Sequence, residues 1–205
     1  MPRKKITDQR RQQIFEGFFE CLSMGGHEQI TIKDIARAAN VSYGVMHYYF
    51  KSKKEIVFAF VEDYVGQQEE LLRSLISASD SPWERLRKII SFLIDKFIFD
   101  QKVNRVFLNL YQMASNDEEI RNCMKNSYAH YRKIVQDVIE FGISRGEFAR
   151  VNPEKSALLF VGCIEGIWLQ ISMDPALSTN KAIYDLLYEN VQLQLDPEKQ
   201  AAGRE

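Results

Sequence analysis

Residues 31–60 read TIKDIARAANVSYGVMHYYFKSKKEIVFAF, and this stretch decides the fold. Thr31 followed three residues later by Asp34 is a variant of the capping box, which predicts a helix that begins directly after the threonine. Asn40 follows that helix, and asparagine tolerates the left-handed backbone conformation better than any residue except glycine. Ser42 can then cap a second short helix. A helix, a tight turn and a second helix form the helix-turn-helix, whose second helix enters the major groove of DNA.

The second short helix carries a distinctive pattern at both ends. It opens with Val41-Ser42, closes with His47-Tyr48-Tyr49 and leads into Phe50-Lys51-Ser52-Lys53. This pattern resembles the signature of the TetR family of bacterial transcriptional repressors, in which Val-Ser opens the recognition helix and Phe-Lys-x-Lys leads into the next helix. Two positions depart from the family: Asn40 stands where most members have glycine, and His47 stands where a phosphate-contacting tyrosine is usual.

The recognition helix and its flanks supply the candidate DNA contacts. Side chains that face the groove can read base edges, whereas hydroxyl, amide and lysine groups can hold phosphates. We expect base-edge contacts from Tyr43 and His47, with Gly44 allowing a close approach to a base pair. We expect phosphate contacts from Ser42, Tyr48, Lys51 and Lys54, and from Thr31 and Lys33 at the start of the preceding helix. The basic segment Arg3-Lys4-Lys5 either lies along DNA or serves as a solubilising end.

The net charge of −1 looks unsuitable for a DNA-binding protein until the chain is divided. Residues 1–55 hold ten Lys and Arg against six Asp and Glu, which is a balance of +4. The remaining 150 residues hold seventeen against twenty-two, which is a balance of −5. This division concentrates positive potential where the helix-turn-helix lies, as a phosphate-binding region requires.

The histidines and cysteines show no catalytic or metal-binding pattern. His27, His47 and His130 share no predicted helix face with cysteines or carboxylates at a suitable spacing. The three cysteines are too far apart for a disulfide framework or a CxxC site. The sequence also contains no Gly-rich phosphate loop and no G-x-S-x-G motif. We therefore expect a protein that is not an enzyme, with no catalytic residues, no metal and no cofactor.

The sequence shows no sign of a membrane segment or an export signal. No apolar run approaches the roughly 20 residues that span a bilayer. The basic N-terminal stretch MPRKKITDQRRQ lacks the apolar centre of a signal peptide. We expect a cytoplasmic protein with no membrane partner.

Start and stop signals divide the chain into helices. The signals are the N-caps Ser81-Pro82-Trp83-Glu84 and Asn152-Pro153-Glu154, the full capping box Ser52-Lys53-Lys54-Glu55, and the breaks Gly25-Gly26 and Arg145-Gly146-Glu147. Glycine readily takes the left-handed conformation past a helix end, so Gly25-Gly26 should end the first helix. The expected helices cover residues 7–24, 53–75, 82–99, 102–114, 117–144, a stretch after 152, and 179–195.

The predicted fold is all-α. We expect a three-helix helix-turn-helix DNA-binding domain at residues 1–51, a helical regulatory and dimerisation domain at 52–195 and a flexible tail at 196–205. The TetR resemblance implies about nine helices, which the start and stop signals allow.

The chain beyond residue 80 is rich in aromatic residues at helical spacing, and plain core packing is the first alternative for each of them. TetR-like proteins build a ligand pocket between these helices, so the resemblance implies that some aromatics line one. The candidate pocket residues are Phe92, Phe107, Tyr111, Tyr128, Tyr131, Glu165 and Trp168. Glu165 interrupts the apolar stretch FVGCIEGIWLQI, and three roles stay open: binding a cationic ligand, pairing with an arginine across a dimer, or reaching solvent.

The class of effector is suggested by the segment Glu165-Gly166-Ile167-Trp168-Leu169. It resembles the corresponding helix of the BetI-like branch of the family, which includes choline-responsive regulators. A carboxylate beside aromatic faces suits a quaternary ammonium group, because the ring faces attract cations. The resemblance therefore implies a small-molecule effector, with a cation as the class to test first.

Two apolar stripes suit pairing with a second copy of the chain. Gly162-x-x-x-Gly166 lets two helices approach closely, and the family forms dimers through its last two helices as a four-helix bundle. The candidate interface residues are Leu158, Val161, Gly162, Glu165, Leu169, Ile183, Leu187 and Val191, with packing inside one chain as the alternative. A single helix-turn-helix makes few contacts, whereas two copies related by a twofold axis read a palindrome.

The hypothesis from the sequence is a ligand-responsive repressor. It binds double-stranded DNA at a palindromic operator as a homodimer and is released when a small molecule binds the C-terminal domain. The alternative is a TetR-like DNA-binding protein without a small-molecule inducer, which is controlled by a protein partner or acts as an activator.

Overall fold

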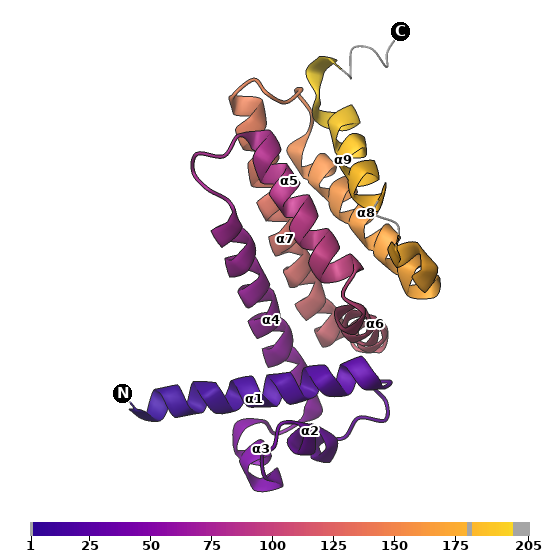
Figure 1. Ribbon diagram of the computed structural model, residues 1–205. Coiled ribbons are helices and arrows are strands. Elements are labelled where there is room, and N and C mark those ends of the chain that lie inside the picture. Colours follow the sequence, from indigo (N-terminus) through magenta and orange to yellow (C-terminus); the bar gives the residue numbers. More distant parts are fainter. Residues whose placement is uncertain (1, 180–181, 199–205) are drawn as a thin grey trace. The chain divides into compact units, whose positions relative to one another are not determined.

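The computed structural model of the protein describes residues 2–179 and 182–198. All secondary structure in this part of the chain is helical, so the all-α prediction is confirmed (Figure 1). The α-helices are α1 (Pro2–Met24), α2 (Ile32–Ala38), α3 (Tyr43–Tyr49), α4 (Lys53–Leu75), α5 (Pro82–Leu93), α6 (Gln101–Asn116), α7 (Glu118–Ser144), α8 (Pro153–Met173) and α9 (Ala182–Leu195). A π-helical segment, η1 (Ile94–Ile98), follows α5, and a 3-10 turn, η2 (Pro175–Thr179), precedes α9.

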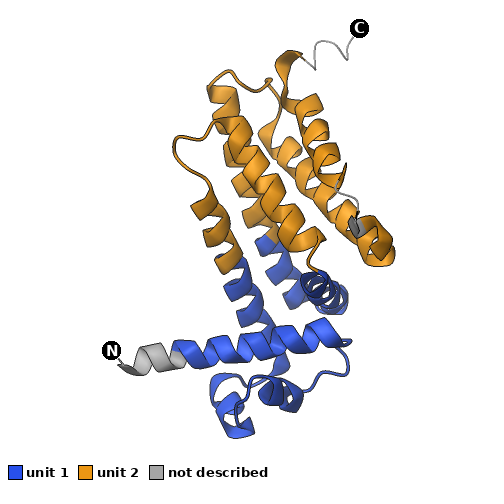
Figure 2. Cartoon of the chain, in the orientation of Figure 1, with its two compact units in different colours: residues 1–66, 101–127 blue, residues 67–100, 128–205 orange. Residues whose placement is uncertain are grey.

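The chain forms two compact units, which Figure 2 colours separately. Unit 1 contains residues 1–66 and 101–127, and unit 2 contains residues 67–100 and 128–205. Unit 1 thus combines the helix-turn-helix, which ends with α3 at Tyr49, with α6, which begins only at Gln101. The boundary between the functional domains at residues 51 and 52 stays a prediction.

The core of unit 1 forms where α1 packs against α2 and α6. The apolar face predicted for the first helix is buried, with Ile14, Phe18 and Leu22 fully covered. Phe18 and Phe60 meet edge to face with ring centroids 5.3 Å apart, which is a favoured aromatic geometry. These aromatics are core residues, as expected.

The end of α1 differs from the prediction. Neither Gly25 nor Gly26 adopts a left-handed backbone, and among the described glycines only Gly146 has a positive φ, of 72°. Asn109 of α6 caps the helix instead, because its Nδ2 donates to the carbonyl oxygens of Leu22 (2.9 Å) and Gly25 (3.0 Å). The last carbonyls of a helix need partners, and here a distant side chain supplies them.

The start of α4 also differs in one detail. Ser52 caps the helix as predicted, since its Oγ accepts from the backbone N–H of Glu55 at 3.1 Å. The reciprocal bond is shifted by one residue, because the Glu55 carboxylate accepts from the backbone N–H of Lys51. The predicted full capping box is therefore only half correct.

In unit 2 the capping box of Ser81 and Glu84 and the cap of Asn152 are both present. The single helix predicted over 82–99 is wrong in its second half, because the α-helix ends at Leu93 and continues as η1. Ile94 and Ile98 are both buried, so the π-helical turn of η1 still places its apolar side chains in the core. The last helix begins at Ala182 and not at 179. Part of the predicted tail, residues 199–205, lies outside the described residues.

Helix α8 corrects the expectation that no apolar run is long enough to span a membrane. By length and composition α8 passes that test, with a mean hydropathy of 1.5 over its most apolar window. One third of this window is buried inside the chain. A single such helix is weak support for a membrane span, because core and interface helices have the same composition.

Candidate DNA-binding site and comparison with known proteins

Local hydrogen bonds build the helix-turn-helix as the sequence predicts. Thr31 Oγ1 accepts from the backbone N–H of Asp34 at 3.2 Å, and Asp34 Oδ2 accepts from the backbone N–H of Thr31 at 3.0 Å. The Thr31 hydroxyl also donates to Asp34 Oδ2 at 2.6 Å, and this bond, with the one from the Thr31 backbone N–H, holds the pKa of Asp34 below its ordinary value because both stabilise the carboxylate. Asn40 has a φ of 52°, which confirms the left-handed turn, and Ser42 Oγ then caps α3 by accepting from the N–H of Val45 at 3.2 Å.

Helix α3 has one buried side and one exposed side. Met46 is fully buried and anchors the helix, and Phe50 is buried directly after its end. Tyr43 and Tyr48 remain 47% and 74% exposed, which leaves large aromatic surfaces in solvent. A large exposed aromatic on a short, well-capped helix is suited to contact with a partner.

The residues predicted to face the groove lie together on α3. The rings of Tyr43 and His47 meet edge to face at 4.4 Å, and Gly44 between them is exposed. Lys33 of α2 sits over the Tyr43 ring, with its Nζ 5.8 Å from the ring centroid. The structure therefore places this lysine and the two rings in one cluster, and their contact with DNA stays a prediction.

Two of the predicted phosphate-binding lysines have different surroundings. Lys51 is exposed, and its Nζ donates to the carbonyl oxygen of His47 at 3.1 Å. Because a carbonyl carries no net charge, this hydrogen bond does not neutralise the ammonium group. Lys54 Nζ instead lies 2.8 Å from Asp117 and 3.0 Å from Glu119 at the start of α7. The pKa of Lys54 is raised by these carboxylates. Since two carboxylates already neutralise this ammonium, the structure does not support Lys54 as a phosphate contact.

The sequence reasoning missed Arg37. Its side chain on α2 is 81% exposed, and its guanidinium reaches Asp34 only at 3.5 Å. A basic residue on α2 near the recognition helix is a further candidate for the DNA backbone. The sequence did contain a signal for this residue, because Arg37 is a basic residue in the last turn of the helix that precedes the recognition helix. The argument from apolar periodicity assigned it only to the solvent-exposed face. The side chains of Arg3, Lys4 and Lys5 lie outside the described residues.

The candidate ligand residues fall into both units. Phe107 and Tyr111 belong to unit 1 and are half-buried, and the Phe107 ring lies 5.8 Å from that of Tyr64. The other five belong to unit 2: Phe92 and Trp168 are buried, and Tyr128, Tyr131 and Glu165 are half-buried. Tyr131 meets Phe97 of η1 edge to face at 5.8 Å.

Glu165 is half-buried in unit 2. Burial raises the pKa of its carboxyl above the ordinary value of 4.5, while the nearby charge of Arg132 opposes this shift. The pKa is raised overall because burial has a larger effect on it than the charge of Arg132 has. Arg132 lies in the same chain, so pairing of Glu165 with an arginine does not require a dimer.

The predicted dimer residues divide between exposed and buried positions. Leu158 of α8 is 59% exposed, and Gly162 and Leu169 are exposed on the same helix. Val161 of α8 is buried, as are three residues of α9: Ile183, Leu187 and Val191. Because those three side chains pack inside the chain, the alternative of packing within one chain holds for them, and they are not available on the surface of α9 for a dimer. The exposed apolar residues of that helix are Leu186 and Leu193.

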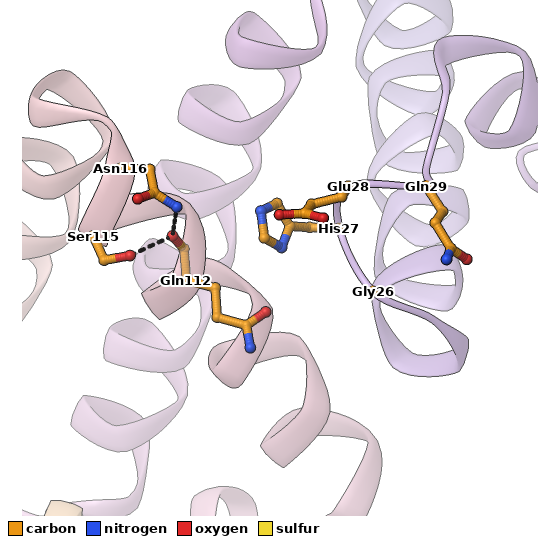
Figure 3. Close-up of a pocket in the computed structure, with 7 residues that line it drawn as sticks. All are labelled: Gly26, His27, Glu28, Gln29, Gln112, Ser115 and Asn116. Carbon is orange, nitrogen blue, oxygen red and sulfur yellow. Dashed lines mark hydrogen bonds between the residues drawn. The ribbon is translucent and has the colours of Figure 1, made fainter.

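Two pockets lie within the units. The pocket in unit 1 has a volume of about 330 Å³ and is lined by Gly26, His27, Glu28, Gln29, Gln112, Ser115 and Asn116 (Figure 3). The pocket in unit 2 has a volume of about 220 Å³ and is lined by Arg73, Ile76, Arg85, Ile134, Asp137 and Val138. Neither contains one of the seven predicted ligand residues.

Two protein families match this chain. Residues 14–60 match the bacterial regulatory proteins of the tetR family, and residues 82–196 match the C-terminal domain of BetI-type transcriptional repressors. The second match covers more than half of the chain. The chain belongs to the TetR family. The first match contains the whole helix-turn-helix, and TetR-family proteins are transcriptional regulators and not enzymes, as the sequence predicted.

Among individual TetR-family proteins, several BetI regulators align along almost the whole chain. The HTH-type transcriptional regulator BetI of Brucella anthropi is 21% identical over 199 residues, which covers 97% of this chain and 100% of the relative. BetI of Stenotrophomonas maltophilia is 24% identical over 178 residues, which covers 84% of this chain and 86% of the relative.

Solved structures agree on the TetR fold. A TetR transcription regulator from Haloarcula marismortui matches with a TM-score of 0.80 and 18% identity, over 92% of this chain and 100% of that one. A transcriptional regulator from Saccharomonospora viridis in complex with choline matches with a TM-score of 0.75 and 18% identity, over 90% and 94% of the two chains.

Proposed function

We propose that this protein is a cytoplasmic homodimeric repressor that binds a palindromic operator and releases it when a small cation binds the C-terminal domain. The observation that carries the proposal is the capped helix-turn-helix, whose recognition helix buries Met46 and leaves Tyr43, Gly44 and Tyr48 exposed. A helix held rigidly on one side and open on the other can enter the major groove without refolding.

Base reading and phosphate binding fall to different residues in this proposal. Tyr43 and His47 contact base edges, and Gly44 allows the backbone to approach them. Lys51, with Ser42, Tyr48, Thr31 and Lys33 as further candidates, holds phosphates. The Lys51 ammonium donates to the carbonyl oxygen of His47, whereas the Glu55 carboxylate is bonded to the Lys51 backbone N–H. Base contacts specify the sequence, whereas phosphate contacts supply affinity for any duplex.

Dimerisation is supported by apolar side chains left in solvent on adjacent helices. Helices α8 and α9 pack side by side (Figure 1), and each keeps exposed leucines. Leu158, Gly162 and Leu169 follow the helical repeat along α8, and Leu186 and Leu193 are two turns apart on α9. Several exposed leucines on two adjacent helices are typical of a surface that a partner covers. A four-helix bundle of two α8 and two α9 helices would cover it.

Glu165 supports a cation as the effector. A half-buried carboxylate gains from a cation, because the ligand charge compensates for the water that burial removes. The choline complex of the Saccharomonospora viridis protein adds a precedent on the same fold. Choline and related ammonium compounds are therefore the effectors to test first.

Release follows from a shift between two populations. A ligand lowers DNA affinity only as far as it binds the released arrangement more tightly than the DNA-bound one. A coupling of about 1–3 kcal/mol would weaken operator binding roughly 5- to 150-fold.

The DNA assay uses fluorescence anisotropy on duplexes from upstream of the protein's own gene, with a scrambled duplex and a salt series. Lys51→Met should weaken binding to every duplex and lower the salt slope by about 2, because the homodimer loses one phosphate contact in each half-site. Lys54→Met is the matched control, since its ammonium is already held by Asp117 and Glu119. The absence of binding to any duplex at low salt would contradict the DNA-binding role.

The dimer assay is sedimentation of the purified protein. Leu158→Arg combined with Leu186→Arg should give monomers, whereas Leu71→Arg, at an exposed leucine of α4, should leave the dimer intact. A wild-type monomer at micromolar concentration would refute the homodimer.

The effector assay titrates choline, betaine and a polyamine against operator binding and melting temperature. Choline should raise the melting temperature and weaken operator binding, and Glu165→Gln should remove both effects. If all three compounds leave the wild type unchanged, the cationic effector is wrong. Operator binding that persists without any effector response would then favour control by a protein partner, and activation in a reporter assay would replace repression.

A further inference from the structure

Asn109 is one of the few buried polar residues in the described chain. Its side chain is 8% exposed, and its amide makes four hydrogen bonds. Nδ2 donates to the carbonyl oxygens of Leu22, Gly25 and Arg105, while Oδ1 accepts from the backbone N–H of His27 at 2.7 Å. Three of the four bonds join α6 to the end of α1 and to the loop between α1 and α2.

That loop, residues 25–31, is mostly exposed. Gly25, Gly26, Glu28 and Gln29 are exposed, and Ile30 is the buried apolar residue of the segment. The pocket of about 330 Å³ separates the loop from the last turn of α6, so the two segments do not pack together there (Figure 3). Side-chain hydrogen bonds from Asn109 therefore hold the exposed part of the loop, while Ile30 anchors its end by apolar burial.

A second side chain holds the same loop from another helix. Lys53, the first residue of α4, donates from Nζ to the carbonyl oxygen of His27 at 2.9 Å and to that of Ile30 at 3.1 Å. Both backbone groups of His27 are thus bonded to distant side chains: its N–H donates to Asn109, and its carbonyl oxygen accepts from Lys53.

The loop leads directly into the part of the molecule that binds DNA. Thr31 is the N-cap of α2, and α2 packs on α3. A shift of the loop therefore moves the start of α2, and α3 moves with it. Asn109 belongs to the stretch that matches the BetI-type C-terminal domain, whereas the loop and Lys53 belong to the stretch that matches the tetR DNA-binding domain.

We propose that Asn109 is a positioning residue for DNA binding, and that through it α6 sets the placement of the α1–α2 loop and of helix α2. With Asn109 in place the loop stays in the binding-competent arrangement. When α6 moves or the amide is removed, the loop samples other positions, and the apparent affinity for DNA falls with the fraction that remains competent. The proposal rests on the DNA binding described above and requires neither a dimer nor a particular effector.

The first test is Asn109→Leu, which keeps the branched shape, the number of side-chain heavy atoms and the net charge but removes the hydrogen-bonding groups. Operator affinity should fall about tenfold, while the salt slope stays unchanged because no phosphate contact is lost. Gln112→Ala is the matched control, since Gln112 lies on the same helix beside the pocket and its side chain makes none of these bonds. An unchanged operator affinity in a folded Asn109→Leu protein would overturn the proposal.

Hydrogen exchange of the free protein gives a readout that needs no DNA. The amide of His27 should exchange about ten times faster or more in Asn109→Leu, with the core amides of α1 near Phe18 unchanged. Equal rates at His27 would overturn the positioning role even if DNA binding itself had failed.

If Asn109→Leu does not fold, Lys53 offers a milder variant. Lys53→Met should speed exchange at His27 and Ile30 and weaken operator binding, whereas Lys53→Arg, which keeps a donor, should restore both. Full operator affinity and unchanged exchange in Lys53→Met would count against control through the loop.

Discussion

Gly17→Ala tests whether α1 and α2 touch closely enough to exclude a single methyl group. A Cβ added at Gly17 would lie 2.5 Å from the backbone nitrogen of Ala39 and 2.8 Å from its Cα and Cβ. Real Cβ contacts are almost never below 3.0 Å, so α1 and the end of α2 must separate by about half an ångström. The neighbour is backbone and not a flexible side chain, so it cannot turn away.

The magnitude follows from two opposing terms. Alanine is about 1 kcal/mol better than glycine inside a helix, which favours the variant. Overpacking a close contact costs about 1–3 kcal/mol, and a backbone neighbour places this site at the upper end. The net loss is about 2 kcal/mol of unfolding free energy. For a chain of this length that corresponds to a fall of about 4–8 °C in melting temperature.

Thermal unfolding followed by circular dichroism measures this loss at equal protein concentration. Gly66→Ala is the control, because an added Cβ there meets nothing within 4 Å. It should raise the melting temperature by about 2–4 °C from helix propensity alone. If Gly17→Ala is stabilised as Gly66→Ala is, α1 and α2 do not pack as closely as described, and the reasoning fails.

Three further substitutions test the recognition helix, the buried carboxylate and a helix cap. Gly44→Ala should raise the melting temperature, since its Cβ meets only Ser42 Oγ at 4.0 Å, yet weaken operator binding in the anisotropy assay if a base pair approaches there. The raised pKa of Glu165 means that the folded state holds this proton more tightly than the unfolded state, so its contribution to stability falls as pH rises from 4.5 through the folded pKa. Glu165→Gln should therefore melt at a higher temperature than the wild type at neutral pH and at the same temperature below pH 4.5; a difference that persists at low pH would contradict this. Ser81→Ala should lose about 1 kcal/mol in denaturant unfolding, because its Oγ caps α5 by accepting from Glu84 N–H at 3.2 Å, and an unchanged midpoint would show that the cap is not needed.

Local chemistry made several features readable from the sequence. Thr31 with Asp34, Asn40, and Ser42 each act on backbone groups within a few residues, so their caps and turn are determined without the rest of the chain. The same holds for Ser81 and for the all-helical class, which follows from apolar periodicity. These predictions are confirmed because no distant contact competes with them.

Features that depend on distant partners were decided by the tertiary structure. The end of α1 suggested a left-handed glycine, but Asn109, more than eighty residues away, caps it instead. Lys54 was predicted to contact phosphate from its charge and its position after the recognition helix. In the structure, Asp117 just before α7 and Glu119 within it pair with its ammonium group. Periodicity also could not tell which leucines of α9 stay in solvent, because both faces of that helix are apolar.

The sequence by itself determined the helix-turn-helix and its family, since both rest on short-range caps and a contiguous motif. Only the tertiary structure decided which polar groups are already satisfied and which remain available to a partner. The physical reason is that a hydrogen bond or an ion pair made within the chain removes that group from binding. Partners eighty residues apart leave no pattern in a single sequence.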